Sequence, residues 1–278
     1  MDKRTFNKIR EIVYEKSGIS LGENKESLVS ARVNKRMRSL DIADSGGYLN
    51  YVMQDESGEE LVNLLDVIST NVTNFYREAD HFDFLTEVFS KWVNNGQKRF
   101  RFWSAASSTG EEPYTIAITL LEALKGQKVD LKILGTDIST VVLEKSRKGV
   151  YDEKRIEPVP RIIRVRYFHK VNNNESVKYA VNDSLKKLIV FKRLNLSKPP
   201  FPMHGPMDAI FCRNVMIYFD KIVREKLVDE MYRLLKPGGY LILGHSESLT
   251  GIPSDFKGVK PSVYIKSVSY THLTLPTN

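Results

Sequence analysis

Apolar side chains in the first 90 residues recur at helical spacing and do not alternate as they would in strands. Phe6, Ile9 and Val13 share one face of a 3.6-residue repeat, and Gly18 follows them as a helix stop. The same spacing predicts helices over residues 6–19, 26–40, 46–54 and 59–70. We therefore expect residues 1–90 to form a small helical domain with its linker.

The period changes at Arg99, where short apolar runs begin to alternate with helical patterns. Strands are expected over residues 99–106, 131–139, 187–196, 207–215, 240–248 and 261–267. Helices are expected over residues 112–126, 140–151 and 221–239, the last ending at the turn Pro237-Gly238-Gly239. This alternation predicts an α/β domain over residues 91–267, with a mostly parallel sheet between two helical layers.

Residues 160–190 interrupt the alternation. Two short alternating runs flank the polar turn "NNNES" at residues 172–176, a pattern typical of a hairpin. We expect a small antiparallel β subdomain inserted here. Residues 268–278 carry no charge and no periodicity, and we interpret them as a vector-derived tail outside the fold.

The composition is that of an ordinary globular protein, with 278 residues, 41% hydrophobic and 27% charged. No apolar run approaches the roughly 18–20 residues of a membrane helix, and the N-terminus lacks the apolar segment of a signal peptide. Cys212 is the only cysteine, which excludes an internal disulfide and a cysteine-based zinc site. We expect a cytoplasmic protein without direct membrane insertion.

The net charge of +8 raises nucleic acid or an acidic protein as a partner. Part of the excess positive charge lies in residues 25–40. This segment could bind such a partner, or it could form an ordinary solvent-exposed helix face. Its basic residues are Lys25, Arg32, Lys35, Arg36 and Arg38.

Polar residues that follow the expected strands are candidates for a binding site, because open α/β sheets bind ligands at the carboxyl ends of their strands. The stretch "FWSAASSTGEEPYTIA" at residues 102–117 predicts a strand, an elbow with one glycine, and a helix. Glu111 and Glu112 lie at this elbow, where carboxylates would repel a phosphate. Asp137 follows the second strand, a position from which a carboxylate commonly accepts hydrogen bonds from ribose hydroxyls.

These residues favour a cationic cofactor that contains a nucleoside. The fingerprint G-x-G-x-x-G and a Walker lysine are absent from the elbow, which disfavours NAD and a P-loop ATPase. S-adenosylmethionine fits, because carboxylates attract both its sulfonium and its ammonium group. Glutamates in a first helical turn also stabilise the helix by about 0.3–1 kcal/mol each, so ligand binding and helix stabilisation are both open for Glu111 and Glu112.

Four segments together resemble the chemotaxis receptor glutamate methyltransferases, the CheR family. They are "TNVTNFYRE" (70–78), "WSAASSTGEEPYTIA" (103–117), "FCRNVMIYF" (211–219) and "LLKPGGYLILGHSES" (234–248). The resemblance implies an N-terminal helical domain, a Rossmann-type class I S-adenosylmethionine-dependent methyltransferase domain and an inserted β subdomain. The implied reaction transfers a methyl group from S-adenosylmethionine to glutamate carboxylates of methyl-accepting chemotaxis receptors and leaves S-adenosylhomocysteine.

The same resemblance implies site residues. Cofactor contacts are implied at Asn71, Thr73, Arg77, Ala105, Glu112, Asp137, Asn195, Leu196, Arg213 and Asn214. Tyr218 matches a tyrosine near the transferred methyl, so Arg77 and Tyr218 are the candidate catalytic residues. Arg77 suits either the substrate's or the cofactor's carboxylate. Docking on acidic receptor helices is implied for Arg32, Lys35, Arg36 and Arg38.

The reaction requires that the reacting groups are aligned and that water is excluded from the site, more than it requires acid–base groups. A glutamate side chain, with an ordinary pKa near 4.3, is already an anion at neutral pH, so neither a general base nor a metal is expected. We expect a monomer that is recruited to membrane receptor arrays. The turn "NNNES" lacks the glycines of relatives that dock a receptor tail peptide there, which leaves tail docking open.

Two other functions fit parts of the sequence. The positive charge suggests a nucleic-acid methyltransferase, but "CRNVMIYF" stands where an amine-methylating N-P-P-Y signature would fall, and no basic motif is interleaved with aromatic residues. The fold would also suit an inactive sensor of S-adenosylmethionine, although Glu112, Asp137 and Arg213 are all present. We therefore expect an enzyme that has no nucleic-acid partner.

Overall fold

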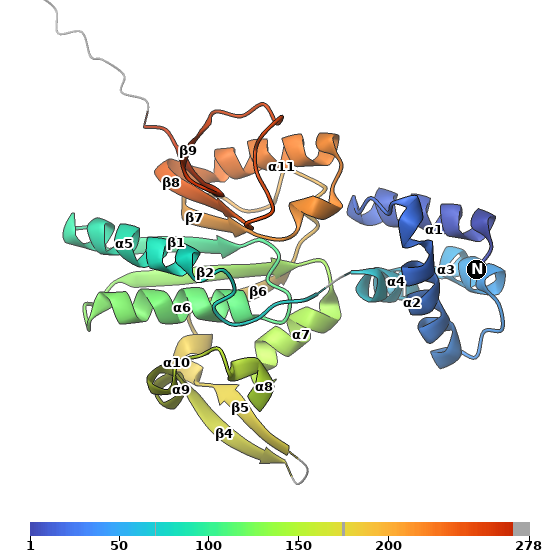
Figure 1. Ribbon diagram of the computed structural model, residues 1–278, viewed down its shortest axis with the longest axis horizontal. Helices are drawn as coiled ribbons and strands as arrows, with labels where there is room; N and C mark the ends of the chain where they lie inside the picture. The colour runs from blue at the N-terminus through green and yellow to red at the C-terminus, as the bar shows by residue number, and fades with distance from the viewer. Residues whose placement is uncertain (70, 174–175, 269–278) are drawn as a thin grey trace, which may run out of the picture.

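The computed structural model describes residues 1–69, 71–173 and 176–268, so the tip of the expected turn and nearly all of the expected tail lie outside it. Its first part, residues 1–69, is helical and stands beside the rest of the molecule (Figure 1). The helices of this helical part are α1 (Lys3–Ser17), η1 (Glu23–Lys25), α2 (Glu26–Ser39), α3 (Ser45–Gln54) and α4 (Glu59–Ile68). Asp2 caps α1 by accepting the N–H of Thr5, and Gly18 ends it with a φ of 72°.

The remainder, which we call the sheet part, is built on seven strands. They are β1 (Arg99–Ser104), β2 (Asp130–Asp137), β6 (Ile189–Arg193), β7 (Met207–Cys212), β8 (Leu235–Leu243), β9 (Phe256–Lys260) and β10 (Val263–Lys266). Their order is β6-β2-β1-β7-β8-β10-β9; the first five are parallel, and β10 pairs antiparallel with β8 and β9. The chain leaves β1 toward β2 on one side and reaches β7 on the other, so the strand order switches at β1.

Alternate side chains of the central strands enter two separate cores, as the pleat requires. Phe100 and Phe102 of β1 pack with α5 (Asp80–Asn94) and α6 (Glu111–Leu124), whereas Trp103 packs on the other face with α11 (Lys221–Leu234). The predicted α/β sheet between two helical layers is thereby confirmed (Figure 1).

The small antiparallel sheet contains β3 (Val150–Asp152), β5 (Ser176–Val181) and β4 (Phe168–Asn173), in that order. Short helices accompany it: α8 (Glu153–Ile156), α9 (Arg161–Tyr167) and α10 (Asp183–Lys186), and α7 (Thr140–Lys148) leads into it. The expected inserted hairpin is present as β4 and β5. Residues 164–167, expected in its first strand, are instead helical, and residues 150–151, expected in a helix, form β3 because Gly149 ends α7 with a φ of 59°.

Two further predictions of local structure differ from the structure. Pro237, Gly238 and Gly239, expected as a helix stop, lie inside β8, since the chain is already extended at Leu235. Strand β9 was not expected at all. Phe75, which precedes α5, packs with Phe82 and other residues of α5 in the core on one face of the sheet.

Among the described residues, no helix has the length and apolar character needed to cross a membrane.

Candidate functional site

A cavity opens at the carboxyl ends of the parallel strands, next to the switch at β1, with walls from both the helical part and the sheet part. The expected cofactor and catalytic positions all line it: Asn71, Thr73, Arg77, Ala105, Glu112, Asp137, Asn195, Leu196, Arg213, Asn214 and Tyr218. The helical part adds Ile19, Lys25, Leu28 and Arg32, among others. Residues that lie up to about 200 positions apart in the sequence thus converge on one cavity, next to the strand switch.

The elbow between β1 and α6 is held in place by its own backbone and by the small sheet. Gly110 has a φ of 98°, and a Cβ there would lie 2.7 Å from the Cβ of Ser146, so a side chain would be both strained and crowded. The hydroxyl of Tyr151 donates to the carbonyl of Thr109 over 2.8 Å. The elbow is therefore a fixed rim of the cavity.

The two adjacent glutamates face in different directions. Glu111 is fully buried; its Oε1 lies 2.5 Å from Nη1 of Arg155, and its Oε2 accepts the Thr109 hydroxyl. Glu112 lines the cavity, where it accepts the hydroxyl of Ser104 over 2.7 Å and a bond from Arg213 over 2.8 Å. Glu111 thus joins the elbow to the small sheet's helix α8, and Glu112 is the glutamate available to a ligand.

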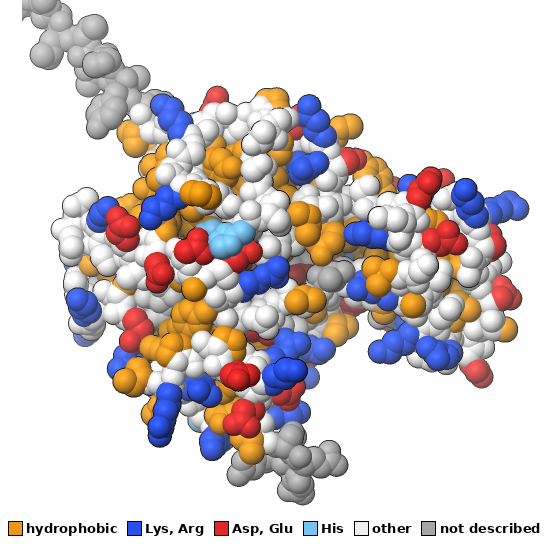
Figure 2. Space-filling model, viewed as in Figure 1, with side chains coloured by type: hydrophobic (Ala, Val, Ile, Leu, Met, Phe, Trp, Pro, Cys, Tyr) orange, Lys and Arg blue, Asp and Glu red, His pale blue; other side chains and the backbone are white. Residues whose placement is uncertain are grey.

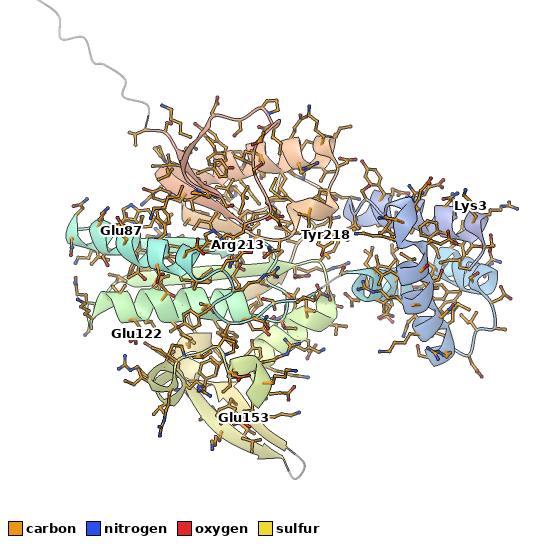
Figure 3. The ribbon with its side chains drawn as sticks, in the orientation of Figure 1. Lys3, Glu87, Glu122, Glu153, Arg213 and Tyr218 are labelled. Carbon is orange, nitrogen blue, oxygen red and sulfur yellow. The ribbon has the colours of Figure 1, made fainter. Side chains whose placement is uncertain are left out.

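Arg213, directly after β7, is the centre of a buried ionic network (Figure 3). Its guanidinium binds Glu112, lies 3.0 Å from Oε2 of Glu78, and donates to the backbone carbonyl of Arg77. Burial raises the pKa of Glu112, against the effect of Arg213. Burial also acts to raise the pKa of Glu78, but Arg213 and an Asn214 hydrogen bond outweigh it and lower that pKa. Arg213 therefore positions two carboxylates as well as lining the cavity.

Asp137 and Glu247 shape the cavity through backbone amides. The buried carboxylate of Asp137 accepts the N–H of Ser108 over 2.9 Å and of Ser139 over 3.0 Å. Burial raises the pKa of Asp137, and the backbone hydrogen bonds oppose this. Glu247 accepts the N–H of Asn214, whose φ is 56°, and of Gly244. These bonds hold the loops after β2, β7 and β8 in register.

Glu78 and Glu247 are the residues that sequence reasoning did not place in the site. Glu78 ends the quoted segment "TNVTNFYRE", and Glu247 lies within the quoted segment "LLKPGGYLILGHSES". Neither lines the cavity in the described part of the chain, since both act on residues that do. A buried carboxylate whose partners are distant in sequence leaves no local pattern that would reveal this role.

Arg77 and Tyr218 both line the cavity, and Tyr218 also contacts the helical part. Nη1 of Arg77 donates to the carbonyl of Val72 over 2.8 Å. Tyr218 ends η2 (Met216–Tyr218), its backbone carbonyl accepts the N–H of Ser20, and Nζ of Lys25 lies 5.3 Å from its ring centroid. In Figure 3 it lies at the border between the two parts. Tyr218 is thus close to the junction between the two parts.

Asn195 connects the two parts directly. Its amide nitrogen donates to the carbonyl of Lys16 at the end of α1 over 2.7 Å, while its Oδ1 accepts the N–H and hydroxyl of Ser197. Leu196 is buried beside it. The carboxyl end of β6 is therefore fastened to the helical part.

The four basic residues of α2 do not share one environment. Arg32 lines the cavity and donates to the carbonyls of Ile68 and Ser69, and Arg36 forms an ion pair with the buried Glu60. Lys35 and Arg38 are exposed. Figure 2 shows that Lys and Arg side chains on the helical part are mixed with acidic ones. Docking through Lys35 and Arg38 stays a prediction, whereas Arg36 stabilises the helical part.

Comparison with known proteins agrees with this geometry. The family descriptions "CheR methyltransferase, all-alpha domain" and "CheR methyltransferase, SAM binding domain" match residues 4–69 and 71–265. The chemotaxis protein methyltransferase of Borreliella burgdorferi is 38% identical and covers 95% of each chain. That of Salmonella typhimurium is 37% identical, over 94% of this chain and 90% of its own.

Among solved structures, an S-adenosylmethionine dependent methyltransferase from Mesorhizobium loti aligns with 52% of this chain and 46% of its own. The TM-score is 0.31 at 14% identity, too low to carry an argument. The family matches confirm the expected class I methyltransferase fold with an N-terminal helical domain. Because these matches and the 38% identity extend over nearly the whole chain, the protein belongs to the CheR methyltransferase family.

Proposed function

We propose that the cavity binds S-adenosylmethionine with its methyl group facing Arg77 and Tyr218, and that the acceptor glutamate enters beside them. The reaction itself is that of the family: the protein is an S-adenosylmethionine-dependent methyltransferase that esterifies glutamate side chains of chemotaxis receptors. The observation that carries the proposal is the convergence of Glu112, Asp137, Arg77 and Tyr218 on one cavity at the strand switch.

Different residues of the cavity are suited to different chemical groups of the cofactor. The carboxylate of Asp137, fixed by the amides of Ser108 and Ser139, is suited to the ribose hydroxyls. Glu112 supplies negative charge for the ammonium and sulfonium groups. Asn195 and Leu196 border the adenine, while Asn71, Thr73, Ala105 and Asn214 complete the contacts.

Methyl transfer from a sulfonium to a carboxylate is a direct displacement: a C–O bond forms as the C–S bond breaks. The acceptor is already an anion and the donor already activated, so we propose that transfer uses neither a general base nor a metal. Arg77 orients a carboxylate, either that of the substrate or that of the cofactor, and Tyr218 restricts the approach. Such alignment contributes several kcal/mol to catalysis.

The partner follows from the same chemistry. We propose that the acidic cytoplasmic helices of a methyl-accepting chemotaxis receptor bind near Lys35 and Arg38, which brings a glutamate to the junction between the two parts. The protein then acts as a monomer in the cytoplasm, recruited to receptor arrays, and has no nucleic-acid partner.

An assay of base-labile methyl groups tests the reaction. Receptor membranes incubated with the protein and methyl-tritiated cofactor should release volatile methanol in alkali, because methyl esters hydrolyse and methylated bases do not. Asp137→Asn should weaken cofactor binding about tenfold, since one strong ribose acceptor is lost, while the exposed Glu144→Gln on α7 serves as the matched control. No volatile counts, or equal affinity in the two variants, would contradict the proposal.

A further inference from the structure

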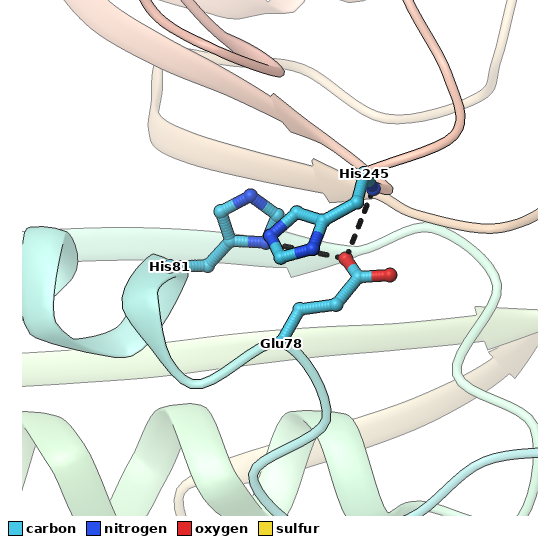
Figure 4. Close-up of side chains that lie close together, drawn as sticks. All are labelled: Glu78, His81 and His245. Atoms are coloured by element: carbon cyan, nitrogen blue, oxygen red, sulfur yellow. Dashed lines mark hydrogen bonds and ion pairs between the residues drawn. The ribbon is translucent and has the colours of Figure 1, made fainter.

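A second cluster of polar side chains lies at the start of α5, in contact with Arg213. Glu78, His81 and His245 each offer one potential ligand atom, and the three atoms lie within 4.8 Å of one another (Figure 4). Glu78 and His81 come from the segment that enters α5, and His245 follows β8. The cluster thus joins two segments that are more than 160 residues apart.

His81 is the least satisfied member of this cluster. Its side chain is 1% exposed, and within the described part of the chain neither ring nitrogen has a hydrogen-bond partner. Nδ1 lies 3.5 Å from Oε2 of Glu78 without forming a hydrogen bond. A buried polar group without a partner costs about 1–3 kcal/mol, and a metal ion would engage the lone pair of one ring nitrogen.

His245 has the hydrogen bond that metal-binding histidines characteristically have. Its Nε2 lies 2.9 Å from a carboxylate oxygen of Asp80. When Nε2 donates to this carboxylate, Nδ1 keeps its lone pair, the arrangement by which an outer carboxylate orients a ligating imidazole. The side chain is 51% exposed, which provides a path for an ion from solvent.

The charges around the cluster favour a cation. Glu78, Asp80 and Glu112 bring three carboxylates near the single guanidinium of Arg213, which lies 3.0 Å from Glu78. A dication at the cluster would share the Glu78 carboxylate with Arg213, and the sum of the local charges would fall toward neutrality.

We propose that Glu78, His81 and His245 bind one divalent transition-metal cation of the zinc type, with solvent in a fourth position. Two imidazoles and one carboxylate are a common zinc ligand set, and ligand atoms about 2.0–2.1 Å from a tetrahedral ion lie roughly 3.3 Å apart. The 3.5 Å between Glu78 and His81 already meets this spacing, and the half-exposed His245 has room to adjust. The ion is structural: it joins the segment before α5 to the loop after β8 and takes no part in methyl transfer.

Binding of Zn²⁺ alone tests this proposal. The full chain, freed of any polyhistidine tag and stripped with a chelator, is titrated with Zn²⁺ against a chromogenic chelator, and Co²⁺ absorption reports the coordination. We expect one ion per chain and a tetrahedral Co²⁺ spectrum. His245→Gln should weaken Zn²⁺ affinity at least tenfold and remove that spectrum. Asp80→Asn, which affects the site only through its hydrogen bond to Nε2 of His245, should weaken the Zn²⁺ affinity about tenfold or more.

His169→Gln is the matched control, because His169 is an exposed histidine on β4, far along the chain from the cluster. It should bind Zn²⁺ as the unaltered protein does. Absence of a saturable one-to-one complex, equal affinity in His245→Gln, or loss of binding in His169→Gln would each overturn the site. Because cofactor binding is not the readout, such a failure leaves the proposed methyltransferase site untouched.

Discussion

Each part of the molecule buries an arginine–glutamate cluster, and the two clusters are built differently. In the helical part, Nε and Nη2 of Arg36 bind Glu60 at 2.8 and 2.5 Å, and the hydroxyl of Tyr48 donates to the same carboxylate. One positive charge meets one negative charge. In the sheet part, Arg213 is shared between two carboxylates, Glu78 and Glu112.

The difference separates a structural pair from a binding site. A balanced pair whose hydrogen bonds are satisfied has no remaining charge to attract a ligand, and it stabilises only its own surroundings. An unbalanced network keeps a negative field, and here Glu112 directs that field into the cavity. In the proposed binding mode, a cationic cofactor would balance the negative charge that Arg213 alone leaves uncompensated.

Arg213→Met breaks the unbalanced cluster and should have the largest effect. It leaves Glu78 and Glu112 buried without a counter-charge, so we expect a loss of about 3–5 kcal/mol in the free energy of unfolding. Displacement of the cavity walls should reduce methylation by at least roughly 100-fold. Urea unfolding and the methyl ester assay measure the two effects; unchanged activity would show that the network is only structural.

Arg36→Met breaks the balanced pair and should affect stability alone. The uncompensated Glu60 should lower the free energy of unfolding by about 3 kcal/mol, while the affinity for S-adenosylmethionine in the folded protein stays the same. Burial acts to raise the pKa of Glu60, but Arg36 and Tyr48 outweigh it, so the folded pKa is below the usual 4.5. This stabilisation is present above pH 4.5 and is lost as the pH falls through the folded pKa.

The pH dependence provides a check on that variant. As the pH falls below 4.5 and through the folded pKa of Glu60, the stability of Arg36→Met should approach that of the unaltered protein. Protonation removes the contribution of the pair in the unaltered protein and the uncompensated buried charge in the variant. Unfolding curves from pH 3 to 7 measure this convergence. A stability difference that is constant across the range would mean that Arg36 contributes by packing rather than by charge.

Glu112→Gln and Glu111→Gln test whether Glu112 binds the ligand while Glu111 only stabilises the elbow. Removing the charge of Glu112 should weaken S-adenosylmethionine binding about tenfold, because its cationic groups lose one Coulomb partner of roughly 1–4 kcal/mol. Glu111→Gln should leave that affinity within about threefold and loosen the contact with Arg155 instead. Calorimetric titration with S-adenosylhomocysteine, which lacks the sulfonium, is the control. The affinity for this ligand should differ less between Glu112→Gln and the unaltered protein than the affinity for S-adenosylmethionine does.

Charge reversal at Lys35 and Arg38 should have the smallest effect. Because these side chains are exposed, we expect receptor methylation to fall only several-fold and the loss to shrink at high salt. Cofactor affinity should be unchanged. Lys170→Glu, on the exposed face of β4, is the matched variant. An equal loss in both would mean that net charge alone, rather than α2, guides the receptor.

The sheet could be predicted from the sequence because its information is local. Alternating residues such as Phe102 and Trp103 distinguish the two faces of a strand, and the turn before Glu111 marks the elbow without reference to the rest of the chain. Predictions based on local signals alone also produced the errors. Glycines are common in turns, yet Gly238 and Gly239 lie inside β8, at an irregularity between Leu235 and Tyr240, which both pair with β7.

The sequence predicted which residues belong to the site but not how their side chains contact one another. The resemblance implied a cofactor contact for Arg213 and receptor docking for Arg36, but their partners, Glu78 and Glu60, are 135 and 24 positions away along the chain. Which guanidinium is already bound, and which carboxylate is left for a ligand, depends on tertiary contacts that no sequence pattern contains.

The bond from Asn195 to Lys16 has a thermodynamic consequence. Since the cavity takes its walls from both parts of the chain, a ligand held there binds only when the two are docked. By linkage, every gain in cofactor occupancy raises the free energy needed to separate them, by about 2.7 kcal/mol at 100 times the dissociation constant. In the proposed binding mode, the cofactor would thereby couple the unfolding of the helical part to that of the sheet part.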